Sequence, residues 1–280
     1  MKYSIQNERF RVSALEIGAE LTEFHDLSCD YEYLWQKCDV WQGQSPLLFP
    51  VVGKLKDDRY TLDGKTYEMP KHGFAIHSKF DLESRSSDEM TFVLRESEET
   101  LRRYPFPFEL RVHYALRADG FRMEHRVKNT GNRKMYFSIG AHPAFQIELG
   151  DRVVMDEEET RGAYRLGSDM LRKKELTPVF DHSREIVVTR ETFLGDALIF
   201  DGLKSGGASV VRANGKNVHV DFGSAPCLGV WAKPGAKYVC IEPWYGIDDN
   251  WDADGDFIRK PYILSLDPGQ EFVFPVTIRV

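Results

Sequence analysis

The chain has 280 residues, of which 42% are hydrophobic and 29% charged, a balance typical of ordinary globular proteins. Its 37 basic and 44 acidic residues give a net charge of −7 at pH 7. We therefore expect neither a nucleic acid nor a membrane as partner, because nucleic acids and anionic membranes attract clusters of Lys and Arg. No stretch approaches the ~20 apolar residues of a membrane span, and the first residues lack the apolar segment of a signal peptide. We expect a cytoplasmic protein.

The four cysteines form no C-x-x-C pair and have no His at the spacing of a zinc site. We therefore expect four reduced, mostly buried thiols, with no disulfide and no structural metal. The four are Cys29, Cys38, Cys227 and Cys240.

Short alternating segments broken by turn residues dominate the chain, and helical periodicity is scarce. Asp-Gly or Asn-Gly stands between two such segments at 63–64, 119–120 and 214–215, and Lys-Pro-Gly does so at 233–235. Because these residues favour tight turns, each predicts a β-hairpin. The predicted hairpins span residues 59–67, 110–127, 209–222 and 228–241, and a last predicted strand spans 271–280.

Regularly spaced strands with few helices indicate an all-β sandwich or barrel. Residues 151–190 are the most polar stretch, with an acidic run at 156–159 and a basic run at 172–174. We interpret this stretch as an excursion from the sheet that includes a short helix. No linker, low-complexity tract or internal repeat interrupts the chain, so we predict one domain over residues 1–280.

Lys54 and His72 are the first candidate site residues along the chain. Lys54 follows Gly53 at the end of an apolar strand, where a cation could meet a ligand, and a solvated surface lysine is the alternative. His72 precedes Gly73, whose conformational freedom lets the chain turn while the imidazole points into a cavity. A loop histidine with structural hydrogen bonds is the alternative there.

His142 and Glu242 follow two predicted strands. Pro143 fixes the backbone after His142, and an imidazole gives and takes protons near neutral pH. Glu242 lies at the end of an apolar strand, a setting that would raise its pKa and suit a general base. A turn histidine and a salt-bridged glutamate are the alternatives, and Trp244 is either a sugar-stacking ring or a core residue.

Two histidines and a glutamate could also bind zinc. This alternative is the weaker one, because the three residues are scattered and lack the i, i+4 histidine pair of a helix-borne site. The sequence has no G-x-S-x-G, P-loop or G-x-G-x-x-G motif, so serine-hydrolase and nucleotide-binding functions have no support from motifs.

Together, these segments resemble the aldose 1-epimerase (galactose mutarotase-like) family, and within it the LacX-like branch. The most specific matches are HGFA at 72–75, GAHPAF at 140–145 and CIEPW at 240–244, in the family's order. The resemblance covers most of the chain and implies a large antiparallel β-sandwich with few short helices. It also implies a sugar-binding cleft on a concave sheet.

The resemblance implies a function and a set of roles as well. An isomerase of this kind interconverts the α and β anomers of a free aldose without a cofactor. By motif, Glu242 would be the catalytic base, His142 the catalytic acid and His72 a second active-site histidine. Asp196 would bind sugar hydroxyls, with Asp201 as its rival.

Two positions depart from the family's pattern. Lys54 stands where the family usually has Arg, so the substrate-binding charge would be kept while the planar, bidentate fork is lost. Ile76 and His77 stand where relatives often carry Arg-Asp. An Arg there could help to hold a polar or phosphorylated sugar, so its absence weakens a sugar-phosphate function.

We expect a mutarotase whose partner is a small-molecule sugar, which needs no metal or cofactor and is a monomer or a homodimer. A non-catalytic carbohydrate-binding or sensing protein on the same fold is one alternative, since fold does not fix function. A hexose-6-phosphate 1-epimerase is the other, and it predicts a cationic rim from residues such as Lys56, Arg59 and Lys71.

Overall fold

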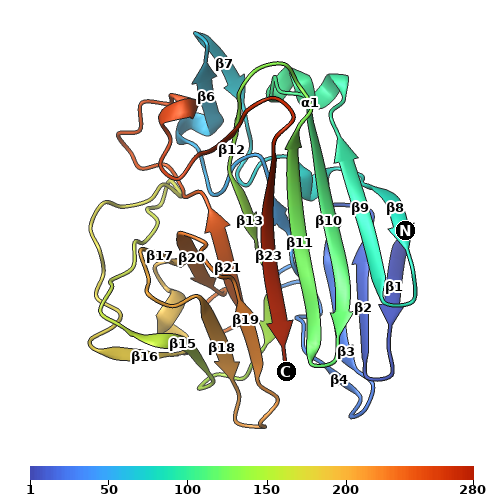
Figure 1. Cartoon of the computed structure of the whole chain (residues 1–280). Helices are drawn as coiled ribbons and strands as arrows, with labels where there is room; N and C mark the ends of the chain where they lie inside the picture. Colours follow the sequence, from blue (N-terminus) through green and yellow to red (C-terminus); the bar gives the residue numbers. More distant parts are fainter.

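The computed structural model describes all 280 residues, and β-strands make up most of its regular structure. The largest element is a nine-stranded antiparallel sheet of order β16-β15-β18-β19-β23-β11-β10-β9-β8 (Figure 1). Its strands are β8 (Asp81–Arg85), β9 (Glu89–Arg95), β10 (Phe108–Arg117), β11 (Gly120–Asn129), β15 (Arg152–Glu159), β16 (Ser183–Val187), β18 (Gly207–Val211), β19 (Val218–Asp221) and β23 (Glu271–Arg279).

Two smaller sheets cover this large sheet. One has the order β17-β20-β21-β13-β5, with β14 paired to β21, and the other has the order β1-β2-β3-β4. The first contains β5 (Leu47–Leu48), β13 (Ile139–Ala141), β14 (Ala144–Gln146), β17 (Leu198–Asp201), β20 (Cys227–Trp231) and β21 (Tyr238–Tyr245). The second contains β1 (Lys2–Gln6), β2 (Phe10–Leu15), β3 (Leu21–Asp26) and β4 (Tyr31–Glu32).

The remaining elements are short. Two strand pairs join β6 (Arg59–Leu62) to β7 (Lys65–Glu68) and β12 (Met135–Phe137) to β22 (Leu264–Leu266). One α-helix, α1 (Glu98–Arg103), and four 3-10 turns, η1 (Lys56–Asp58), η2 (Ala75–His77), η3 (Glu191–Phe193) and η4 (Phe257–Arg259), complete the chain. None of these helical segments has the length and apolar character that crossing a membrane requires.

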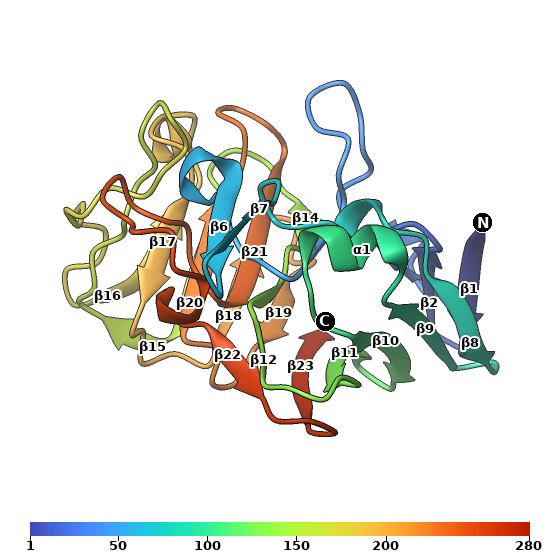
Figure 2. The same cartoon turned by 90° about the horizontal axis from the view of Figure 1, so that it is seen from above.

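The sheets pack face to face through large apolar side chains, with the two smaller sheets at opposite ends of the large one (Figures 1 and 2). Tyr245 of β21 meets Phe274 of β23 with ring centroids 5.2 Å apart, and Phe24 of β3 meets Phe121 of β11 at 4.9 Å. One cluster of 65 buried apolar residues draws on all three sheets, so they share a single core. This arrangement confirms the predicted antiparallel β-sandwich.

All four predicted hairpins form, and the last predicted strand is β23. The turn between β6 and β7 shows why the sequence signal works. Asp63 and Gly64 both adopt positive φ, 50° and 74°, which a two-residue hairpin turn of type I′ requires.

Two expectations are corrected. The stretch 151–190 is not wholly an excursion, because β15 and β16 are strands of the nine-stranded sheet, and no helix forms within it. Val153 and Met155 alternate inward from β15, while the buried carboxylate of Glu159 accepts hydrogen bonds from Ser205, so the acidic run is compatible with a strand. All four cysteines are free as expected, but Cys29 and Cys38 are exposed.

Candidate active site

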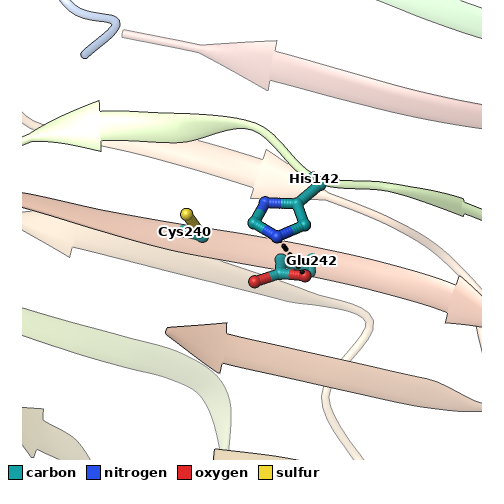
Figure 3. Close-up of side chains that lie close together, drawn as sticks. All are labelled: His142, Cys240 and Glu242. Atoms are coloured by element: carbon teal, nitrogen blue, oxygen red, sulfur yellow. Dashed lines mark ion pairs between the residues drawn. The ribbon is translucent and has the colours of Figure 1, made fainter. Parts of the chain in front are cut away.

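Strand β21 presents three buried side chains on one face. Because side chains alternate along a strand, Cys240, Glu242 and Trp244 point the same way, and all three are buried. His142 lies between β13 and β14, and both of these strands pair with β21. The His142 ring therefore lies directly over Glu242 (Figure 3).

His142 and Glu242 form a close, buried pair. The Nε2 atom of His142 lies 3.1 Å from Oε2 of Glu242, with side-chain exposures of 9% and 3%. Burial lowers the pKa of His142 to about 3 and raises the pKa of Glu242 well above its usual range, because each charged form loses its hydration. Both shifts favour the uncharged form of each group, and in that form the pair carries a single proton.

Three charged groups surround this pair. Burial is what raises the pKa of Glu242, and the Lys71 ammonium acts against it, whereas Asp248 and Asp196 raise that pKa further. Asp248 is itself buried, which raises its own pKa, and its Oδ1 accepts a hydrogen bond from the Lys54 N–H at 2.7 Å. Carboxyl groups thus outnumber the single cation around the pair.

His72 is held as a neutral hydrogen-bond donor. The Gly53 N–H donates to Nδ1 of His72 at 3.1 Å, which places the ring proton on Nε2. Burial also lowers the pKa of His72 well below its usual value. The turn needs glycine at position 73, where φ is 78° and a Cβ atom would lie 2.2 Å from the carbonyl oxygen of Phe49. The rings of His72 and His142 are 5.9 Å apart.

The Trp244 ring lies against glycine residues on β13 and β20, the two strands that flank β21. A Cβ atom at Gly140 of β13 would lie 2.5 Å from Cδ1 of Trp244, and one at Gly229 of β20 would lie 2.7 Å from its Cζ2. The indole Nε1 is buried beside Glu242, and the indole lowers the pKa of that carboxyl. The ring therefore offers a flat apolar surface next to Glu242.

Aromatic side chains also enclose His142. Trp41 stacks on it with centroids 5.4 Å apart, and Trp231 meets it edge-on at 5.8 Å. Trp41 belongs to the loop between β4 and β5, which projects from the molecule in Figure 2. These rings account for the burial that keeps His142 uncharged.

Together these residues line a cavity of about 230 Å³. Five of the six predicted site residues lie in its wall: His72, His142, Asp196, Glu242 and Trp244. The sequence-distant motifs thus meet at one place, with a proton-sharing pair, a neutral imidazole donor and a flat indole. Such a set can move protons at a polar ligand and stack against an apolar face of it.

The chain matches a known family over most of its length. The family model for aldose 1-epimerase matches residues 1–243. The chain belongs to the aldose 1-epimerase family. Protein LacX, encoded on a plasmid of Lactococcus lactis subsp. lactis, is 30% identical over 288 residues, which cover 96% of this chain and 95% of LacX. This similarity confirms the family and branch expected from the HGFA, GAHPAF and CIEPW motifs.

Solved structures of similar proteins agree with this epimerase-family fold. A galactose mutarotase related enzyme from Lactobacillus acidophilus superposes with a TM-score of 0.94 at 34% identity, covering 100% of this chain and 97% of the other. A galactose mutarotase-like protein from Lactobacillus casei gives the same TM-score at 25% identity, covering 100% and 99% of the two chains.

Lys54, the sixth predicted site residue of this epimerase-family chain, does not line the cavity. Its ammonium lies 3.6 Å from the carboxylate of Asp58, and its backbone N–H, rather than its side chain, contacts the buried Asp248. Asp201, the alternative to Asp196, does not line the cavity either. Its carboxylate binds Arg161 and Tyr262 instead.

Asp248 and Trp41 line the epimerase-family cavity but were not predicted as site residues, and Lys71, which also lines it, was considered only for the cationic rim of the hexose-phosphate alternative. Lys71 directly precedes the HGFA motif, yet from the sequence it looks like a surface lysine. Asp248 follows the CIEPW segment by four residues, and this proximity was the only available signal. Nothing in the sequence near Trp41 indicates its contact with His142, because the contact joins segments about 100 residues apart.

Proposed function

We propose that this chain is a cofactor-independent aldose 1-epimerase that interconverts the α and β anomers of a free aldose. The observation that carries this proposal is the buried His142–Glu242 pair, 3.1 Å apart in the wall of the cavity. Membership of the aldose 1-epimerase family supports the reaction class.

The proton balance of anomer exchange matches this pair. Ring opening removes one proton from the C1 hydroxyl, breaks the bond between C1 and the ring oxygen, and delivers one proton to that oxygen. Rotation about the C1–C2 bond and the reverse transfers then give the other anomer. The reaction therefore needs one group that accepts and one that donates, which a pair sharing a single proton provides. The reactive form of the pair is the one in which the shared proton lies on His142 and Glu242 is ionised. In that form we assign the base to Glu242 and the acid to His142.

We assign the other cavity residues to substrate binding. The Nε2–H of His72 donates to a sugar oxygen, and the Asp196 carboxylate accepts from sugar hydroxyls. Trp244 stacks against the apolar face of the ring, as aromatic side chains do at sites with one apolar side. Lys71 favours the ionised form of Glu242 while the C1 hydroxyl is deprotonated. Each of these roles is part of the proposal.

A neutral sugar suits the cavity better than a hexose phosphate. Of the three cations considered for a phosphate rim, only Lys71 lines the cavity, whereas Lys56 and Arg59 do not. Arg59 is paired with Asp57, and the cavity wall also contains Asp196 and Asp248, which repel an anionic ligand. We therefore expect turnover of free aldoses.

The test is anomer exchange followed by NMR on a panel of aldoses and their 6-phosphates, with Glu242→Gln as the control. We expect exchange on at least one free aldose that the variant does not catalyse. Sugar-induced shifts without any exchange would overturn the catalytic proposal and leave a binding protein. Exchange on the phosphates alone would instead favour the phosphosugar epimerase.

A further inference from the structure

Cys240 is a buried thiol that the proposed reaction does not use. It precedes Glu242 by two residues on the same face of β21 and is 0% exposed. His142 approaches the same place from between β13 and β14, so three different ligand types converge on one spot (Figure 3).

The three groups are spaced almost as a metal ion would require. A ring nitrogen of His142, the sulfur of Cys240 and a carboxylate oxygen of Glu242 all lie within 4.8 Å of one another. Tetrahedral zinc with bonds of 2.0–2.3 Å places its ligand atoms ~3.5 Å apart. The Nε2 to Oε2 distance is already 3.1 Å, so closing the site requires the thiol to come nearer to the other two ligand atoms by about 1.3 Å or less.

We propose that His142, Cys240 and Glu242 form a binding site for zinc or a similar thiophilic divalent cation, and that the bound ion inhibits the epimerase. The inhibition rests on the proposed function, because the ion would occupy the acid and the base of the reaction. The ion is an inhibitor in this proposal and takes no part in turnover.

The donor set decides which ion the site takes. One nitrogen, one sulfur and one oxygen suit zinc and related transition metals, whereas magnesium and calcium prefer oxygen ligands alone. Binding would release the Cys240 thiol proton and the proton shared by His142 and Glu242 to the solvent. The resulting thiolate and carboxylate neutralise the two charges of the ion, which suits a fully buried position. With three protein ligands, a fourth position stays open, as in zinc sites that bind water or a small molecule.

Binding of zinc and binding of sugar should exclude each other. His142 and Glu242 themselves line the cavity that would receive the sugar. Trp244, two residues after Glu242 on the same face of β21, lines it as well. We therefore expect zinc to raise the apparent KM for the sugar, and a saturating sugar to weaken zinc binding.

Isothermal titration with zinc chloride tests the site directly, without relying on activity. The protein used is the full chain with Cys29→Ser and Cys38→Ser, which removes the two exposed thiols. Cys240→Ser and Cys240→Ala are then compared with Cys227→Ser, a matched control at the other buried thiol, on β20. Circular dichroism confirms that each variant is folded.

We expect one zinc ion per chain, with an affinity that falls by more than about 100-fold in both Cys240 variants. This loss follows because removing even a residue that merely orients a metal ligand costs roughly 10–100-fold. Cys227→Ser should bind like its parent. Zinc should inhibit anomer exchange, and the Cys240 variants should exchange sugar but resist zinc.

Unchanged zinc binding in the Cys240 variants would overturn the proposal, because another cluster, such as the partly buried Glu23, His25 and Glu32, would then supply the ligands. Binding that leaves exchange unaffected, or that activates it, would overturn it as well. If no sugar is turned over at all, the proposed function fails. The titration then still decides whether the metal site exists.

Discussion

The proton shared by His142 and Glu242 determines how activity should depend on pH. A second proton enters the pair only near the His142 pKa of about 3, and the last proton leaves above the usual carboxyl range, because burial raises the pKa of Glu242. We therefore expect kcat/KM to stay flat from neutral pH to well below 6.5 and to fall only at more acid pH. A profile that falls with a midpoint near 6.5 would show instead that an ordinary, hydrated histidine controls the rate.

Replacing either member of the pair should separate turnover from binding. We expect Glu242→Gln and His142→Asn to lower kcat by ~10²–10⁴-fold, because each removes one proton transfer. Gln keeps the size of Glu, and Asn keeps a polar but smaller side chain in place of the imidazole. KM should change much less than kcat. Initial rates of anomer exchange over a range of sugar concentrations measure both constants. A variant in which KM alone rises would reassign that residue to substrate positioning.

Individual site residues were predictable from the sequence where a motif surrounds them. His72, His142 and Glu242 lie within HGFA, GAHPAF and CIEPW, and the structure brings all three to one cavity. Lys54 was predicted to bind substrate through its side chain, but the sequence does not indicate whether the side chain or the backbone of this residue faces the site. Its backbone N–H contacts Asp248, while its side chain turns to Asp58.

At the scale of elements, Gly140 and Gly229 fix where the floor of the cavity lies. A Cβ atom at position 229 would lie 2.7 Å from Trp244 Cζ2 and 3.3 Å from Glu242 Cβ. We expect Gly229→Ala to reduce the free energy of unfolding by roughly 1–3 kcal/mol and to lower activity, because the indole and the base must both shift. Chemical denaturation and anomer exchange measure the two effects.

The matched control for Gly229→Ala is a double variant. Adding Trp244→Phe removes the atom with which the new methyl group collides, so the double variant should lose less stability than the sum of the two single changes. Such non-additivity is expected of side chains in direct contact. Strict additivity would mean that the methyl group disturbs β20 itself rather than the Trp244 ring.

The elements themselves were predictable to the extent that their signals are local. The turn residues at 63–64 and 119–120 predict hairpins, because the two strands of each hairpin are adjacent in sequence. The order of the sheets was not predictable, since the pairing of β23 with β11 and β19 joins distant segments. β15 was missed because the exposed acidic side chains at 156–158 hide the inward alternation of Val153 and Met155. β16 was missed because Ile186 is its only buried residue, which leaves no alternating pattern.

At the scale of the whole molecule, one core shared by three sheets supports the prediction that residues 1–280 form a single domain. That prediction stays a prediction, as do the cytoplasmic location and the choice between monomer and homodimer. The core also contains ionisable groups that the site does not use. His125 of β11 is 1% exposed and stacks on Phe274 of β23 with centroids 5.4 Å apart.

Buried His125 should make the stability of the fold depend on pH. Burial lowers its pKa to about 4 in the folded chain, against ~6.5 in the unfolded chain, so between these values the unfolded chain binds more protons. The stabilisation is therefore fully present above pH 6.5 and is lost as the pH falls towards 4. Between pH 7 and pH 5 we expect His125 to account for a loss of roughly 2 kcal/mol in the free energy of unfolding.

Denaturant titrations of the wild type and of His125→Phe at pH 7 and pH 5 measure this contribution. The phenylalanine keeps a ring against Phe274 but cannot bind a proton, so the variant should lose roughly 2 kcal/mol less than the wild type on acidification. His72 and His142 are buried in the same way and destabilise both proteins equally at pH 5, so the difference between the two isolates His125. An identical acid response in both proteins would mean that water reaches His125 inside the sheet.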